Sequence, residues 1–67
     1  MTIDEANQRL IEAMNTWREV DADYQAGRTD LLTLKAACGA VAFARTMLRE
    51  AHREAQRAAR TNREREQ

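Results

Sequence analysis

The chain has 67 residues, with 11 lysines and arginines balanced by 11 acidic residues, one cysteine, one histidine, no proline and no serine. A chain of this length has room for one small domain, whose core barely offsets the conformational entropy lost on folding. One cysteine cannot form an internal disulfide, and one cysteine with one histidine cannot complete a four-ligand zinc site, so neither a metal site nor a cofactor is expected. The sequence therefore predicts that partner chains supply the missing stability.

The first expected helix begins at Ile3, because Thr2 and Glu5 have the spacing of a capping box. From there, large and small residues each recur every seven positions, which is the heptad pattern of packed helices. The large residues are Ile3, Leu10, Trp17 and Tyr24, and the small ones are Ala6, Ala13 and Val20. Gly27 can take the left-handed conformation that ends a helix, so this helix is expected to span about 3–26.

A second helix is expected over about 30–60, with Thr29 or Asp30 as its cap. Its heptads place Leu34, Val41, Leu48 and Ala55 at the large positions and Ala37, Ala44, Ala51 and Ala58 at the small ones. A link of about three residues makes the two helices antiparallel neighbours. The predicted fold is therefore all-α: an antiparallel helical hairpin over 1–60 with an alanine-rich heptad seam, followed by a polar tail at 61–67 that frays.

Apolar residues remain outside this seam, and an apolar face of that width is typical of helix bundles. We therefore expect the hairpins to assemble into a four-helix bundle or a higher homo-oligomer. The expected oligomer interface consists of Ile11, Met14, Leu32, Ala36, Ala40, Phe43 and Met47. Gly39 is unfavourable in mid-helix by about 1 kcal/mol relative to alanine, and we interpret it as a place where another helix, rather than a ligand, comes close.

The charges are distributed unevenly. Residues 1–30 carry seven acids and three bases, whereas residues 31–67 carry four acids and eight bases. Steps of four residues place arginines on one side of the second helix, and their side chains could bind phosphate or carboxylate oxygens. We call Arg45, Arg49, Arg53 and Arg57, joined by Arg60, the arginine stripe. The candidate ligand-binding residues are Arg45, Thr46, Arg49, Arg53 and Arg57. The preferred interpretation is a solvated charged face, with Glu50–Arg53 and Glu54–Arg57 as pairs within the helix. The antiparallel register also sets Arg45, Arg49 and Arg53 beside Glu12, Glu5 and Asp4.

No catalytic residue is predicted, because the chain has no serine nucleophile, no glycine-rich phosphate loop and no Glu-x-x-His motif. Cys38 is interpreted as a small buried hydrophobic residue and His52 as a solvated helix residue. Trp17 and Tyr24 are interpreted as core residues in preference to a stacking platform for bases. The protein is therefore predicted to be a non-enzyme.

The segment Asp21-Ala22-Asp23-Tyr24-Gln25-Ala26 resembles the Asp-Ala-Asp-x-Gln-Ala sequence near the turn of the Rop-type RNA-binding helical hairpins. This resemblance implies a dimer of hairpins. The family binds RNA through basic and polar residues of its first helix, whereas the first helix here is acidic.

A second resemblance runs through Ala44-Arg45-Thr46-x-Leu48-x-Glu50 and Arg57-Ala58. These residues are similar to the last helix of small phage anti-defence proteins that sequester cyclic oligonucleotide signals between helical protomers. The resemblance implies an oligomer in which Arg45 and Thr46 help to line an anion site.

No stretch approaches the apolar length of a membrane span, and the N-terminus lacks the basic start of a signal peptide, so a cytoplasmic protein without a membrane partner is expected. The predicted function is that of a homo-oligomeric binding protein, acting as adaptor, inhibitor or assembly factor on an unidentified protein partner. The alternative is sequestration of a cyclic nucleotide or another phosphate-rich ligand by the arginine stripe.

Overall fold

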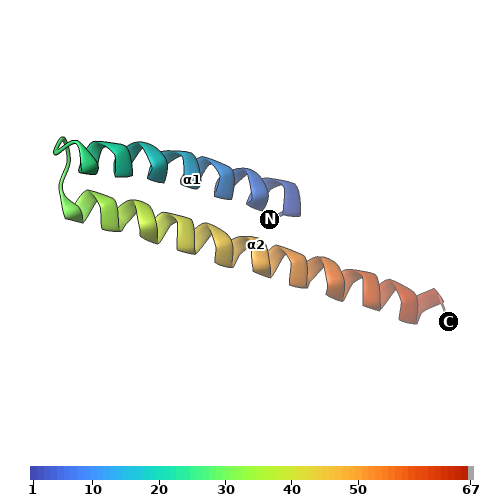
Figure 1. Ribbon diagram of the computed structural model, residues 1–67. Helices are drawn as coiled ribbons and strands as arrows, with labels where there is room; N and C mark the ends of the chain where they lie inside the picture. Colours follow the sequence, from blue (N-terminus) through green and yellow to red (C-terminus); the bar gives the residue numbers. More distant parts are fainter. Residues whose placement is uncertain (67) are drawn as a thin grey trace.

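The computed structural model describes residues 1–66 and shows two antiparallel helices joined by a short turn (Figure 1). Helix α1 spans Ile3–Gln25 and helix α2 spans Leu31–Glu66. The predicted all-α hairpin is confirmed. Helix α2 continues beyond the end expected near residue 60, because arginine and glutamate, which make up residues 63–66, are good helix formers. Gln67 lies outside the described residues, and fraying of the end of α2 in solution stays a prediction.

The turn between the helices is fixed by a Schellman motif at the end of α1. Gly27 has a φ of 75°, a left-handed conformation that glycine adopts without strain. The N–H of Gly27 donates to the carbonyl of Tyr24 at 3.0 Å, and that of Arg28 donates to the carbonyl of Asp23 at 2.7 Å. The Arg28 guanidinium also pairs with the Asp23 carboxylate at 2.9 Å. The chain reversal is therefore encoded within α1 and the residues directly after it.

Both helices begin at capped N-termini. The Thr2 hydroxyl accepts the backbone N–H of Glu5 at 3.1 Å, the first of the two hydrogen bonds expected of a capping box. Asp30, rather than Thr29, caps α2: its Oδ1 accepts the backbone N–H of Thr33 at 2.9 Å and the Thr33 hydroxyl at 2.8 Å. These hydrogen bonds, the backbone one above all, hold the pKa of the Asp30 carboxyl below its ordinary value of 3.8.

Acid should therefore weaken the start of α2. Because the pKa of Asp30 is lower in the folded chain, its contribution to stability is complete above the unfolded-state value near 4 and is lost as the pH falls through the folded value. Asp30→Asn keeps an oxygen acceptor but does not titrate, so its melting midpoint should fall less between pH 5 and pH 2 than that of the parent. Circular dichroism at 222 nm measures this, with Asp21→Asn as the control. Equal acid sensitivity of the parent and Asp30→Asn would contradict the assignment.

The seam between the helices is made of alanine. Ala6 of α1 and Ala37, Ala44 and Ala51 of α2 are the buried apolar residues of the described chain, and no large side chain there is fully buried. Ala37, Ala44 and Ala51 are successive small positions of the predicted heptads, so the predicted seam is confirmed. Large heptad residues such as Leu10 and Val41 are half-buried along its edges. The core of the hairpin is therefore thin.

The register of the two helices agrees with the expected one to within two residues. The indole N–H of Trp17 donates to the sulfur of Cys38 at 3.2 Å, and the numbers of these two residues sum to 55, against 57 for the expected neighbours Glu12 and Arg45. At the open end, Ile3 lies across a shallow hollow from Ala51 and Ala55. The part of α2 after about residue 55 therefore projects beyond α1 (Figure 1).

Two residues expected in the core are exposed. Cys38 is exposed because it directly follows Ala37, and each helical residue turns about 100° from the one before it, which takes the thiol away from the seam. Tyr24 keeps 38% of its surface exposed because it lies in the last turn of α1, and α2 begins only at Leu31. The interpretation of both as buried packing residues is wrong.

Helix α2 is also long enough and apolar enough to cross a membrane, judged by length and composition alone. The expectation that no stretch qualifies is therefore wrong: residues 31–48 contain only two charged residues, Lys35 and Arg45. In the hairpin the same stretch carries the seam residues Ala37 and Ala44. A core helix of a water-soluble bundle passes the same test, so a cytoplasmic location stays a prediction.

Candidate interaction surfaces

One side of α2 carries a row of apolar residues beside the seam, and all of them except the half-buried Met47 are exposed. We call Leu32, Ala36, Ala40, Phe43 and Met47 the apolar row. Their spacings of four, four, three and four residues place them on one side of the helix. Leu32 is 76% exposed and Phe43 is 65% exposed. The hairpin by itself therefore leaves two large apolar side chains of this row in water.

The apolar row lies beside the seam, on one definite side of it. Phe43 directly precedes the buried Ala44, whereas Cys38 directly follows the buried Ala37, so Phe43 and Cys38 turn to opposite sides of the alanines. Gly39 lies four residues before Phe43 and is therefore on the same side of α2 as the row. A Cβ built on Gly39 meets nothing within 4 Å. Nothing within the hairpin therefore requires glycine at this position.

The other side of the seam is a groove of about 300 Å³ between the two helices. Its lining residues are Met14, Trp17, Cys38, Val41, Ala42 and Arg45. Ile11 is 45% exposed and lies three residues before Met14, on the same side of α1. The structure thus divides the predicted interface: five of its residues form the apolar row, and Ile11 and Met14 belong to the groove side.

The arginine stripe does not pair with the acids of α1. Arg28–Asp23 is the only salt bridge within 4.0 Å among the side chains of residues 1–65, so the expected pairing of Arg45, Arg49 and Arg53 with Glu12, Glu5 and Asp4 is wrong. The reason is the direction in which the side chains leave the seam. Met14 follows Ala13 and lies in the groove with Arg45, whereas Glu12 precedes Ala13 and turns to the opposite side. Glu12 and Arg45 are therefore near each other in register but on different sides of the hairpin.

The candidate ligand-binding residues form an open surface. Arg45 lines the groove, whereas Arg49, Arg53 and Arg57 are exposed along α2. The Thr46 hydroxyl donates to the carbonyl of Ala42 at 3.2 Å, within its own helix. All five candidate residues lie on α2. In the described chain no second element faces them to form the other wall of a ligand site.

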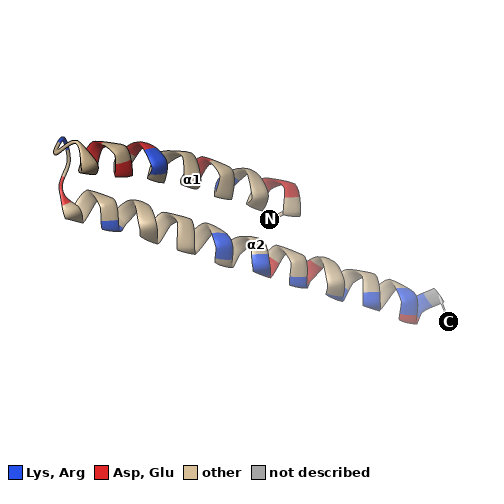
Figure 2. Cartoon of the chain, viewed as in Figure 1, with Lys and Arg blue, Asp and Glu red and all other residues tan. Residues whose placement is uncertain are grey.

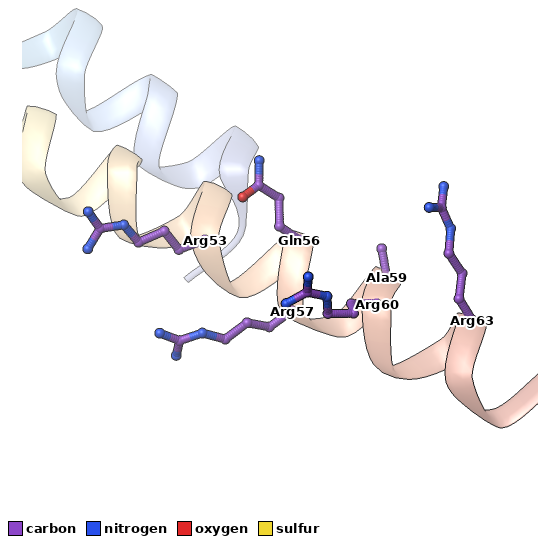
Figure 3. A pocket seen from close by; sticks show the side chains of 6 residues that line it. All are labelled: Arg53, Gln56, Arg57, Ala59, Arg60 and Arg63. Carbon is purple, nitrogen blue, oxygen red and sulfur yellow. The ribbon is translucent and has the colours of Figure 1, made fainter.

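Basic side chains continue along the part of α2 beyond α1, where the second half of the helix is rich in arginine (Figure 2). Arg53, Gln56, Arg57, Ala59, Arg60 and Arg63 line a hollow on this surface. Figure 3 shows that Arg53 and Arg57 extend in one direction while Arg63 extends in another. All the lining residues come from α2, so the hollow has no opposite wall.

Comparison with known protein families, curated proteins and solved structures finds no match for this chain. Among the side chains of residues 1–65 there is no group of three or more histidines, cysteines, aspartates or glutamates placed to hold a metal ion. The apolar row, the groove and the arginine stripe are therefore the features that bear on function.

Proposed function

We propose that this protein is a small non-enzymatic helical binding protein that associates with copies of itself and acts through protein contacts as an adaptor, inhibitor or assembly factor. The observation that carries the proposal is the contrast between the two sides of α2. The seam buries only alanines, whereas the apolar row leaves Leu32 and Phe43 mostly exposed.

The energetics favour burial of this row by another chain. Removing a leucine or phenylalanine side chain from water contributes about 1.5–3 kcal/mol. This is large for a domain of this size, in which burial of the core barely offsets the conformational entropy lost on folding. An alanine seam contributes much less, because each methyl group removes little surface from water. Self-association therefore supplies stability that the single hairpin lacks.

The native mass tests this proposal. Light scattering at micromolar concentration, in buffer without detergent, should give at least twice the chain mass of 7.7 kDa. The melting midpoint should also rise with protein concentration, because assembly and folding are linked. A monomer with a cooperative, concentration-independent melt would contradict self-association, and a protein that stays soluble only in detergent would indicate that α2 enters a membrane.

A second candidate function is binding of a phosphate-rich ligand, such as a cyclic nucleotide, by Arg45, Thr46, Arg49, Arg53 and Arg57. What favours it is the lack of an acidic partner within 4.0 Å of these arginines in the described chain. Glu50 and Glu54 line a hollow with Arg53 and Arg57, but they form no salt bridge with them. An oligomer could bring a second helix opposite them, as the resemblance to cyclic-oligonucleotide-sequestering proteins implies.

Calorimetric titration separates the two functions. Under the proposed protein-binding function, a panel of cyclic di- and trinucleotides should give no heat. The double variant Arg49→Gln, Arg53→Gln should then assemble like the parent and change stability by no more than about 1 kcal/mol, as is usual for exposed charges. Binding that weakens as salt rises, and that the double variant loses while Arg63→Gln, Arg65→Gln retains it, would establish the nucleotide function instead.

A further inference from the structure

We infer that a second copy of this chain covers the apolar row, with the two α2 helices antiparallel about a two-fold axis at Gly39 and Ala40. This inference rests on the proposed self-association. It adds the surface that is buried, the direction of the helices and the position of the axis.

The apolar row of one chain is complementary to the same row of an antiparallel second chain. An antiparallel pairing centred between residues 39 and 40 sets Leu32 against the partner subunit's Met47 and Ala36 against the partner subunit's Phe43. Each bulky phenylalanine then meets an alanine, and the smallest residues, Gly39 and Ala40, meet at the axis. Such a contact uses the same patch on both chains and closes as a dimer.

Gly39 gives the position of the axis. Glycine destabilises the middle of a helix relative to alanine, and the space around Gly39 is open within the hairpin. A helix that crosses at Gly39 makes use of the missing side chain, because two backbones can approach more closely where one of the two facing residues carries no Cβ. The second copy thus accounts for a glycine that the hairpin alone does not require.

The charges of α2 give the direction of the pairing. A parallel pairing would set Arg57 beside the partner subunit's Arg57 and Glu50 beside the partner subunit's Glu50, and such like-charge contacts are unfavourable. The antiparallel pairing places the two arginine-rich ends at opposite ends of the dimer (Figure 2). At 1.5 Å per residue, the two copies of position 56 are then about 50 Å apart.

The direction is measured with one spin label per chain. Gln56→Cys in a Cys38→Ser background places the label on an exposed residue outside the row, and serine keeps an acceptor for the Trp17 indole N–H. Pulsed dipolar spectroscopy should give a distance of about 50 Å between labels, whereas a parallel dimer would give about 20 Å or less. A dimer with the short distance overturns this inference and leaves the proposed function standing.

The surface is tested with a matched pair of leucine substitutions in α2, one in the apolar row and one beyond it. Gly39→Leu places a large side chain where the two α2 helices are proposed to cross. The dimer dissociation constant, measured by sedimentation, should therefore rise about tenfold or more. Leucine forms helices better than glycine, so a damaged helix does not explain such a loss. Ala59→Leu, on the exposed part of α2 beyond α1, should leave the constant within about twofold. The reverse pattern, or no effect of Gly39→Leu, overturns the inference, and a monomeric parent overturns the proposed self-association as well.

Discussion

Phe43→Asp should abolish self-association and leave the chain largely unfolded at micromolar concentration. In the isolated hairpin this side chain is 65% exposed, and a substitution at such a position normally changes stability by no more than about 0.5 kcal/mol. In the proposed assembly the same side chain is core. Its loss then costs about 3–5 kcal/mol, as for a buried phenylalanine, and a carboxylate at the interface adds a desolvation cost. Small domains have stabilities at the low end of about 5–15 kcal/mol, so the assembly should not survive the change.

The control adds the same charge where no burial is proposed. Gln56→Asp lies on the exposed part of α2 beyond α1 and should assemble and melt like the parent. Sedimentation velocity and circular dichroism at matched concentrations report the mass and the helicity of both variants. A Phe43→Asp protein with the parent's mass and midpoint would show that the apolar row is solvent-exposed in the working protein.

The seam could be predicted from the sequence because it depends only on spacing. Alanine at positions 37, 44 and 51 recurs every seven residues, and nothing but a helix pair places such a series on one line. The turn was predictable for a similar reason, since Gly27 is the residue that tolerates a positive φ. The register followed from the length of the turn, and the contact between Trp17 and Cys38 agrees with it.

What lies on either side of the seam could not be read from a count of apolar or charged residues. Register alone places Glu12 near Arg45, but the side on which each leaves the seam depends on whether it precedes or follows a seam alanine. That signal was present in the sequence: Met14 follows Ala13, and Phe43 precedes Ala44. It would have separated the groove side from the apolar row and excluded the expected salt bridges.

Ala44→Leu should lower the free energy of unfolding by about 1–3 kcal/mol, the usual cost of overpacking a tight core. Ala44 is 6% exposed and lies in the middle of a seam whose other buried residues are all alanines. Replacing its methyl group with an isobutyl group forces the two helices apart along their length, which also weakens the contacts of the half-buried residues at the seam edges. Urea denaturation followed at 222 nm should show a lower midpoint and a less cooperative transition.

The matched control for this change is Ala59→Leu. Ala59 lies on α2 beyond the end of α1 and is exposed, so the same substitution has space there and should change the free energy of unfolding by no more than about 0.5 kcal/mol. The difference between the two variants isolates packing from helix propensity, because both replace alanine with leucine in the same helix. If Ala44→Leu instead unfolded at higher urea than the parent, the added side chain would be filling space, and the close approach of α1 and α2 at this alanine would not exist in solution.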